Sequence, residues 1–455
     1  MSTSDAVRAS SPGTGSGDAP LTLDEPPQRT LGLGASLGLW GNLGVSLLLP
    51  VAAVFVVLPG RSLGETLGAV AVGAAIGSLL LGIGAAAGAR EGVPAMVLLR
   101  GLLGRRTSWL PTAFNLVQCV GWATFEIVII AEAASRVLGL PRWPFVLVAG
   151  ALATLMALRP LSAVRLLARY AVWAAAAAIV YLFVEVLAEP LPPLSGGSAT
   201  SFWTAADIVI ALPISWFPLA ADYTRHARSG RTALAGASIG YGAATFVMFT
   251  LGVLALAAFG SSGLDVVDAL LAAPLGALAV LVLVAVELDE AFANLYSTAV
   301  SAQNVVPRAD RRVLAVVVGA AATVLALTFD IAAYEPFLFL IGAVFVPLVG
   351  VFAVGYALTP RGAWDTSDTA RARPAFLLPW AAGFVAYQLT LPTYFDGTGS
   401  GWTSWWTARQ ADLGIDPANG WSASLVSLAV AAVLTALLCL PSALRRARAT
   451  PARAR

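Results

Sequence analysis

Residues 110–140 read LPTAFNLVQCVGWATFEIVIIAEAASRVLGL, and this stretch decides the class of fold. A helix that crosses a bilayer needs about 20 mostly apolar residues in a row, and this run is longer than that. Glu126 stands near its centre, one helical turn after Trp122. A charge at that depth is unfavourable unless it is paired or hydrated, so a carboxylate there indicates a functional site.

Runs of the same kind follow one another along the whole chain. Of the 455 residues, 58% are hydrophobic and only 11% are charged, whereas a soluble domain is about a quarter charged. The runs are continuous and rich in Ala and Leu, which favours helices over the alternating strands of a membrane barrel. We therefore predict an all-α polytopic membrane protein embedded in the lipid bilayer. About twelve transmembrane helices are expected, at 34–58, 65–89, 110–138, 143–159, 166–188, 203–223, 234–259, 275–304, 312–330, 335–358, 374–393 and 421–441.

The arginines predict the orientation of these spans. With the N-terminus in the cytoplasm, 23 of the 27 basic residues, all of them arginine, fall in the inside segments. Cytoplasmic loops of membrane proteins are enriched in Arg and Lys in this way. The pattern predicts a multi-pass protein of the cell inner (cytoplasmic) membrane with both termini cytoplasmic.

Four parts are expected along the chain. Residues 1–30 are rich in Ser, Gly, Pro and Asp and predict a disordered cytoplasmic tail. Residues 31–393 hold a core of ten helices together with span 11. Residues 394–420 form an extracytoplasmic loop whose tryptophans suit the headgroup layer. Residues 421–455 hold span 12 and a basic cytoplasmic tail.

Two spans carry helix breakers. Gly41 and Gly44 lie at mid-membrane depth in span 1, and Pro213 and Pro218 lie in span 6. Proline removes a backbone donor and clashes with the preceding turn, so span 6 should be interrupted. Spans 1 and 6 occupy matching places if spans 1–5 and 6–10 are two inverted repeats. A matched pair of interrupted spans points to a transport site near the middle of the membrane.

Composition also excludes several classes of function. The net charge of +2 is too small to indicate nucleic-acid binding. Cys119 and Cys439 form no metal-binding spacing and are expected to be buried thiols. The single histidine, His226, lies in a basic loop and is expected to be solvated. With no P-loop and no HExxH motif, we predict no enzyme, no cofactor and no metal site. The sequence sets no oligomeric state.

Trp122 and Glu126 share one face of a helix. A tryptophan ring can stack on a flat aromatic ligand, and a carboxylate one turn away can accept two N–H bonds from the edge of that ligand. The pair therefore predicts a site for a small, flat, nitrogen-rich heterocycle. Trp216, between the two prolines of span 6, is a candidate for a second aromatic wall, with ordinary packing as the alternative.

Span 8 contains the other acidic residues at membrane depth, in the stretch AVELDEAFANLYSTAVSAQN (285–304). Glu287 and Glu290 are three residues apart and can share a face, whereas Asp289 points elsewhere. Such oxygen-rich groups can bind a hard cation or relay a proton. The alternative is that one carboxylate braces a broken helix. Near the outer end of span 3, Glu132 and Arg136 are expected to form a structural ion pair.

Four stretches resemble the nucleobase–cation symporter family 1, which transports cytosine, purines, allantoin, hydantoins and related rings. LGLWGNLGVS (37–46) is similar to the first span of the family, and residues 77–122 are similar to its passage from span 2 to span 3. SWFPLAADYTRHAR (215–228) is similar to the end of its span 6, and ANLYSTAVSAQNVVP (293–307) to its span 8. The resemblance implies a five-plus-five inverted repeat of the leucine-transporter type with two appended helices. It also implies ion-coupled uptake by alternating access.

The resemblance assigns roles to individual residues. It implies that Trp122 stacks on the substrate ring and that Asn294 and Ser46 are polar substrate contacts. Glu126 stands where a member that binds hydantoins has glutamine. Pro213 stands where that relative has its second stacking tryptophan, so this wall is absent or has moved to Trp216.

The cation site implied by the resemblance departs further from the family. The backbone carbonyls that hold sodium in other members correspond to Asn42, Val45 and Ala285. The serine–threonine pair of span 8 corresponds to Leu288 and Asp289. Leucine cannot bind sodium, whereas a buried aspartate can bind a cation or take up a proton instead. We therefore expect Na⁺ or H⁺ as the coupling ion and favour H⁺.

The predicted function is ion-coupled uptake of cytosine or a related aminopyrimidine or purine. A carboxylate at Glu126 pairs with adjacent ring N–H and exocyclic NH₂ donors, as guanine offers, or as cytosine offers when its ring nitrogen is protonated. The alternatives are another substrate on the same fold, such as allantoin, a hydantoin, a thiamine-precursor pyrimidine or an amino acid. A sensor or channel without transport activity is the remaining alternative.

Overall fold

The computed structural model describes residues 27–159, 172–260, 265–360, 362–392, 401–416 and 420–449. In these ranges the structure is helical, and the only extended pairing is an isolated bridge between Leu31 and Ala227. Most of the predicted N-terminal tail, residues 1–26, lies outside the described residues. The last residues of the predicted tail, 27–30, are described, and the carbonyl oxygen of Gln28 lies 3.1 Å from Nδ1 of His226 in the loop after span 6.

The first half of the chain forms helices in every predicted span. These are α1 (Leu33–Leu43), α2 (Leu48–Val51), α3 (Ala53–Val56), α4 (Leu63–Glu91), α5 (Ala95–Leu98), α6 (Arg100–Leu103), α7 (Trp109–Leu138), α8 (Arg142–Leu158) and α10 (Val172–Ala188). Residues 95–103 form two short helices, α5 and α6. They lie in the passage between the long helices α4 and α7.

The second half follows the same pattern. It contains α11 (Phe202–Ser215), α12 (Ala220–Thr224), α13 (Gly230–Ala235), η2 (Gly236–Tyr241), α14 (Gly242–Phe259), α15 (Val266–Ala272), α16 (Gly276–Ala302), α17 (Arg311–Ala326), η3 (Ile331–Ala333), α18 (Tyr334–Leu358), η4 (Pro374–Phe376), α19 (Leu377–Thr390), α20 (Trp402–Asp412) and α21 (Ala423–Ala449). Among the described residues, five continuous helical stretches are long and apolar enough to cross a membrane: 63–91, 109–138, 230–259, 331–358 and 423–440. The total number of crossings stays a prediction.

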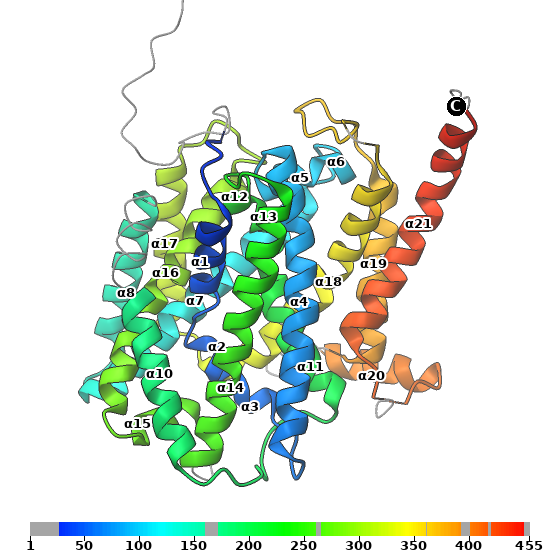
Figure 1. Ribbon diagram of the computed structural model, residues 1–455. Helices are drawn as coiled ribbons and strands as arrows, with labels where there is room; N and C mark the ends of the chain where they lie inside the picture. The colour runs from blue at the N-terminus through cyan, green and yellow to red at the C-terminus, as the bar shows by residue number, and fades with distance from the viewer. Residues whose placement is uncertain are drawn as a thin grey trace, which may run out of the picture.

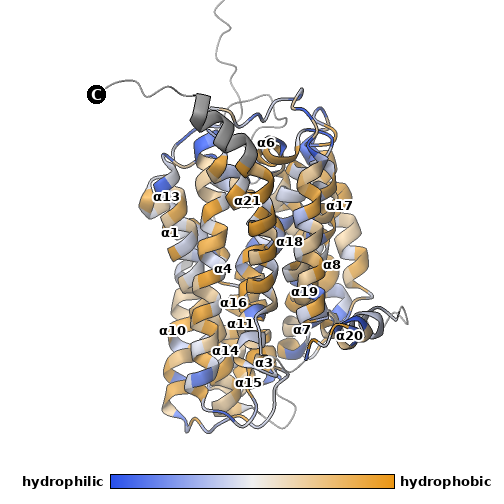
Figure 2. Ribbon diagram, turned by 90° about the vertical axis from the view of Figure 1, so that its right-hand side faces the viewer, coloured by the Kyte–Doolittle hydropathy of each residue, from blue (hydrophilic) through white to orange (hydrophobic). Residues whose placement is uncertain are grey.

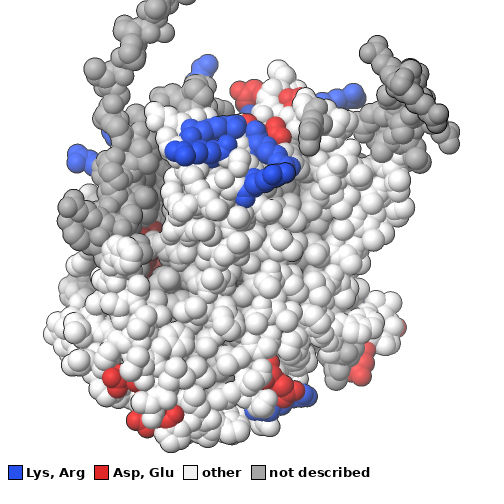
Figure 3. Space-filling view, in the orientation of Figure 1, with Lys and Arg blue, Asp and Glu red and all other residues white. Residues whose placement is uncertain are grey.

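The long helices stand side by side in one upright bundle, with α21 at one edge (Figure 1). Apolar residues dominate the long helices (Figure 2). The face seen in Figure 3 has its arginines mainly at the end where α5, α6 and α12 lie, and a wide band below them carries few charges. This is the distribution expected of a helical protein that crosses a bilayer.

Helices α7 and α16 pack against each other along much of their length. Two buried polar pairs join them: Asn115 Nδ2 donates to Ser301 Oγ at 2.8 Å, and Asn304 Nδ2 donates to Thr112 Oγ1 at 2.9 Å. Hydrogen bonds of this kind hold membrane helices together where no hydrophobic force acts between them. The two helices that carry the predicted site residues are therefore held in a defined register.

Both predicted helix breaks are present. In span 1, α1 ends at Leu43 and α2 begins at Leu48, and in span 6, α11 ends at Ser215 and α12 begins at Ala220. Gly41 remains helical, so the first break is located at Gly44. A Cβ on Gly44 would lie 2.7 Å from Cβ of Ala244, which is closer than Cβ atoms approach in proteins, so glycine is needed for this packing. Pro213 lies inside α11, and Pro218 lies in the break itself.

The helix that packs against α1 contains a π-helical segment, η2, which the sequence did not predict. A π-helical turn widens the helix locally, and such turns occur often at functional sites. Here it places Tyr241 at the end of the widened turn. The side chain of Tyr241 is 1% exposed and belongs to the site described below.

The described residues near the C-terminus are mostly helical. The predicted extracytoplasmic loop 394–420 contains an 11-residue helix, α20, and α21 continues to Ala449 rather than ending near 441. The fourth part of the chain is thus helical over most of its described length.

The predicted ion pair in α7 is present, with Arg136 Nε 3.1 Å from Glu132 Oε1. Cys119 is buried as expected, whereas Cys439 is only partly buried.

His226 is half-buried rather than solvated. Its Nδ1 lies 3.1 Å from the carbonyl oxygen of Gln28, next to the bridge that joins Leu31 to Ala227. Burial, together with the positive charge of Arg225, lowers the pKa of His226. The imidazole therefore helps to hold the N-terminal segment in place.

Candidate functional site

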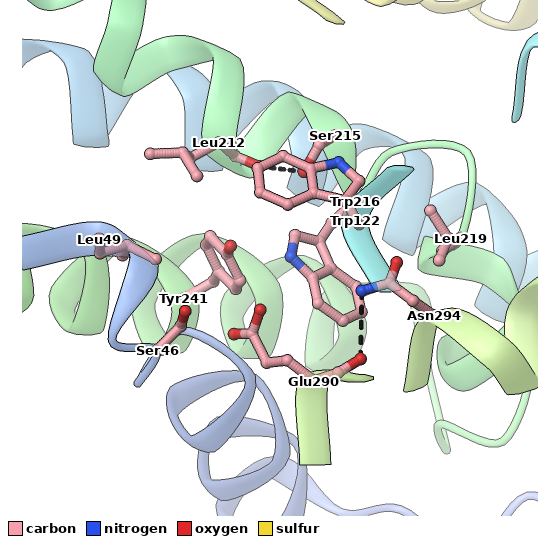
Figure 4. Close-up of a pocket in the computed structure, with 10 residues that line it drawn as sticks. All are labelled: Ser46, Leu49, Trp122, Leu212, Ser215, Trp216, Leu219, Tyr241, Glu290 and Asn294. Atoms are coloured by element: carbon pink, nitrogen blue, oxygen red, sulfur yellow. Dashed lines mark hydrogen bonds between the residues drawn. The ribbon is translucent and has the colours of Figure 1, made fainter. Parts of the chain in front are cut away.

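A pocket lies between the two helix breaks (Figure 4). It is lined by Ser46, Leu49, Trp122, Leu212, Ser215, Trp216, Leu219, Tyr241, Glu290 and Asn294. These residues come from the break of span 1 and the adjoining α2, from α11 and the break of span 6 that follows it, and from α7, η2 and α16. The two interrupted spans thus meet at one site, because their exposed backbone must be satisfied by protein or a lined cavity.

Each of the two predicted tryptophans is held by other aromatic rings. The ring centroid of Trp122 lies 5.2 Å from that of Phe337 and 5.9 Å from that of Tyr334. Both partners belong to α18, and both contacts are edge-on. The ring of Trp216 lies 6.1 Å from Trp40, also edge-on, and 6.0 Å from Tyr241. Such contacts fix the tilt of each ring. The pocket therefore has an aromatic side chain on α7 and a second one at the break of span 6.

The carboxylate that lines the pocket is Glu290, whose side chain points toward Tyr241 and Ser46 (Figure 4). Glu126 is completely buried and is not among the lining residues. Among the described residues, neither oxygen of Glu126 accepts a hydrogen bond. The charged groups that act on Glu126 are Glu287 and Glu290. The structure therefore puts Glu290 at the pocket and Glu126 behind it.

Glu287 braces the break of span 1. Its Oε1 accepts the hydroxyl of Ser46 at 2.7 Å, and its Oε2 accepts the backbone N–H of Leu47 at 2.5 Å. These donors lie just before α2, where unpaired N–H groups and the helix dipole favour a negative charge. This geometry matches the bracing alternative for a span 8 carboxylate. It also occupies the hydroxyl of Ser46, which was expected to contact substrate.

We expect Glu287→Ala to destabilise the protein by about 3 kcal/mol, because the hydroxyl of Ser46 and the N–H of Leu47 would be left buried without an acceptor. Thermal unfolding of the purified protein measures this. Glu287→Gln keeps one acceptor oxygen and should lose less than half as much. Equal stability of Glu287→Ala and the unmodified chain would contradict the bracing role.

The predicted ion-site residues are only partly brought together. Asn42 donates a short side-chain hydrogen bond to Asp289, which joins span 1 to α16. The carbonyl oxygen of Asn42 accepts the N–H of Val45 at 3.0 Å. Ala285 is exposed, whereas Asp289, one turn later, is completely buried. Asn42, Val45 and Asp289 thus lie at the first break, and Ala285 lies at the outer surface of α16.

Four buried carboxylates gather around the breaks: Glu126, Glu287, Asp289 and Glu290. The charged groups that act on Glu126, Asp289 and Glu290 are other members of this set. Buried carboxylates without a basic partner cannot all be ionised unless protons or cations accompany them. Among the described residues, no three acidic, His or Cys side chains are arranged to hold a metal ion.

The pocket is small in this structure. The centre of a water molecule can move in about 10 Å³ of it, which is room for about one water. A flat heterocycle needs more space, so the walls must move apart before one can enter. The interrupted backbones of spans 1 and 6 form part of those walls.

Five lining residues were not predicted: Leu49, Leu212, Ser215, Leu219 and Tyr241. Ser215 and Leu219 flank Trp216 and Pro218, so the break itself pointed to them. Tyr241 lies between Gly240 and Gly242, and this close glycine pair was the signal that another helix approaches there. The two remaining leucines have no signal in the sequence, because they resemble any other apolar residue of a span.

Comparisons with known proteins agree with this architecture. A family described as "Permease for cytosine/purines, uracil, thiamine, allantoin" matches residues 37–375. The cytosine permease of Escherichia coli (strain K12) is 29% identical over 212 residues, which are 43% of this chain and 49% of the relative. The cytosine permease of Escherichia coli O157:H7 is 28% identical over the same length. The match therefore spans about half the length of these curated relatives.

Solved structures share the fold over nearly the whole chain. Mhp1, a nucleobase–cation-symport-1 family transporter in a closed conformation with bromovinylhydantoin bound, has a TM-score of 0.69 at 16% identity and covers 94% of this chain and 95% of its own. A manganese transporter of Eremococcus coleocola has a TM-score of 0.58 at 13% identity and covers 93% of this chain and 98% of its own. These relatives are transporters, not enzymes. They confirm the all-α, leucine-transporter type of fold.

The family match covers about three quarters of the chain and includes both helix breaks, α7 and α16. The chain is therefore a multi-pass membrane protein that belongs to the family of permeases for cytosine and purines, uracil, thiamine and allantoin.

Proposed function

We propose that this protein takes up cytosine, or a related aminopyrimidine or purine, by ion-coupled alternating access. One observation carries the proposal: a buried pocket between two helix breaks has Trp122, Trp216 and the carboxylate of Glu290 in its walls. Aromatic faces suit a flat ring, and a carboxylate suits a ring edge rich in N–H groups. The Escherichia coli cytosine permeases among its relatives support the same class of substrate.

Different pocket residues would recognise different parts of a ring-shaped substrate. Trp122 would stack on its face, and Glu290 would accept N–H bonds from its edge. Asn294 donates its amide nitrogen to the carbonyl oxygen of Glu290 at 3.1 Å, so its amide oxygen is the atom left to accept from the ligand. Glu126, directly behind the wall, would share a proton with Glu290 rather than read the ring itself.

A proton is the coupling ion that the acidic cluster favours. Asp289 holds the side chain of Asn42 at the first break, so a change in its protonation acts on the break directly. Glu290 faces the ligand and Glu126 lies behind it, so the charge of the ligand and that of the cluster are linked. A sodium ion held by the same oxygens is the alternative, and it is distinguished by experiment below.

We propose that the protein lies in the inner (cytoplasmic) membrane. Its arginine-rich end, with α5, α6 and α12, then faces the cytoplasm. Arg100 at this end is 4% exposed and pairs with Asp368 at 2.6 Å. The positive-inside pattern of the loops supports this orientation. A reporter fused to either terminus should then be cytoplasmic.

A binding and uptake experiment tests the proposal. The purified protein is screened by thermal shift against cytosine, guanine, uracil, allantoin, hydantoin and the aminopyrimidine of thiamine, with and without Na⁺. Uptake of the best ligand is then measured in proteoliposomes. We expect cytosine or another amino-substituted ring to bind best and to accumulate against its gradient. Preference for allantoin or hydantoin would assign the protein to another substrate of the family, and passive equilibration would assign it to a channel.

The coupling ion is measured in the same vesicles. We expect a proton uncoupler to abolish accumulation and the removal of Na⁺ to leave it unchanged, because the carboxylate cluster can exchange protons. Accumulation that requires Na⁺ and persists with the uncoupler, at a constant Na⁺ gradient, would contradict proton coupling.

A further inference from the structure

The short helix α12, which follows the break of span 6, is held to three neighbouring helices. On the α4 side, a Cβ added to Gly88 would lie 2.7 Å from Cα of Ala221, so the two helices touch at their backbones. On the α16 side, Tyr223 Oη donates to the carbonyl oxygen of Ala293 at 3.3 Å. On the α5 side, Asp222 Oδ1 accepts the backbone N–H of Ala95 at 2.9 Å.

Asp222 is the unusual member of this set. Its side chain is 2% exposed, and in the described part of the chain its Oδ2 accepts no hydrogen bond. Arg225, one turn later, is also buried, and the described residues show no ion pair between the two. The other ionisable groups near Asp222 are Tyr223 on α12 and Cys119 on α7. A buried carboxylate with one unpaired oxygen is hydrated when the helices around it separate, which offsets the loss of its hydrogen bond to Ala95.

The contact between Asp222 and Ala95 joins two sides of the pocket. The chain that leads into α12 carries Trp216 and Leu219, two lining residues. The chain that follows α5 leads through α6 into α7, which carries Trp122. The hydrogen bond between α12 and α5 therefore joins the segment that follows Trp216 to the segment that leads to α7, on the side of the molecule where the arginines gather (Figures 1 and 3).

We propose that Asp222 is a positioning residue that latches this end of the pocket. Its carboxylate holds α12 against α5 while the pocket is closed, and its release opens the pocket toward the arginine-rich end. The proposal rests on the proposed function in one respect, because alternating access requires the pocket to open toward this end. It assigns the task of holding that end closed to one side chain outside the pocket.

Cys119 is a natural reporter for this opening. It lies on α7, is completely buried and has its Sγ 3.6 Å from Asn115 Oδ1, near Asp222. The chain has two cysteines, so Cys439→Ser leaves a single thiol. In that background, Asp222→Ala is expected to raise the labelling rate of Cys119 by a charged maleimide at least tenfold. Asp222→Asn should raise it less, because the amide oxygen still accepts from Ala95.

Asp207 is the matched control. It is a buried carboxylate of the same broken span, on α11, and it accepts the backbone N–H of Ala423 at 2.7 Å and the hydroxyl of Ser422 at 2.5 Å. Asp207→Ala removes a contact of the same kind from the other half of the span. Cys119 labelling should stay at the rate of the Cys439→Ser background, since α12 and α5 are untouched.

An unchanged labelling rate in folded Asp222→Ala, or an equal rise in Asp207→Ala, would overturn the latch. If Asp222→Ala does not purify as a single folded species, Asp222→Asn decides the question: a rise of at least twofold supports the latch, and a smaller rise or none overturns it. The labelling requires no substrate. A failed ligand screen would therefore overturn the proposed function without changing this result.

Discussion

Replacing Trp122 by alanine is expected to weaken the binding of cytosine by roughly ten- to a hundredfold, because stacking on an aromatic side chain contributes about 1–3 kcal/mol per base. The neighbouring rings of Tyr334 and Phe337 hold Trp122 edge-on and cannot present the same face. Isothermal titration of the purified protein measures the change. Uptake in vesicles should fall with the affinity.

Two further substitutions control this experiment. Trp122→Phe keeps an aromatic face and should recover most of the lost affinity. Trp143, on α8, is 60% exposed and lies on the outer surface, so Trp143→Ala should leave the affinity as it is. Unchanged cytosine affinity in Trp122→Ala would mean that this ring is a packing residue and that the substrate lies elsewhere.

Glu290→Gln is expected to weaken cytosine binding by roughly tenfold to a hundredfold, since a hydrogen bond to a charged group contributes about 1.5–3 kcal/mol. It should also reduce accumulation in vesicles to the background, because the carboxylate is part of the set that exchanges protons. The same substitution removes a charge from a group of buried carboxylates, so the thermal stability should stay the same or increase. Lost binding with retained stability is the combination that identifies a ligand contact.

Glu132→Gln is the matched control for this variant. Glu132 lies on α7 outside the pocket, where it pairs with Arg136, and its side chain is 30% exposed. Its replacement should leave both affinity and accumulation unchanged. Should Glu290→Gln bind cytosine normally while Glu126→Gln does not, the assignment of the two carboxylates would have to be exchanged.

Much of the fold follows from local properties of the sequence. Hydrophobic runs located the helices, and Gly44 and Pro218 located the two breaks within a few residues. Trp122 and Asn294 were predicted for the pocket and lie in its wall. The helices and their breaks could be predicted because backbone freedom and hydropathy are local properties of a single span, whereas the substrate contacts of Trp122 and Asn294 stay predictions.

The carboxylates were harder to assign from the sequence. The spacing of Glu287 and Glu290 indicated a shared face, yet Glu287 turns to the first break and Glu290 to the pocket. Asp289 was expected to point away from them, and it binds Asn42 at the same break. The break of span 1 leaves hydrogen-bond donors that point in several directions. The helical periodicity of α16 therefore does not determine which of its carboxylates accepts from them.

The sequence by itself determined that this chain is a helical membrane protein of the permease family, with two interrupted spans and acidic residues at membrane depth. Only the tertiary structure decided which acid meets the pocket, which one braces a broken helix and which one holds α12. The reason is physical: Ser46 and Glu287 are 241 residues apart, and Ala95 and Asp222 are 127 apart. Contacts at such separations depend on the rotation and packing of whole helices, which no local pattern records.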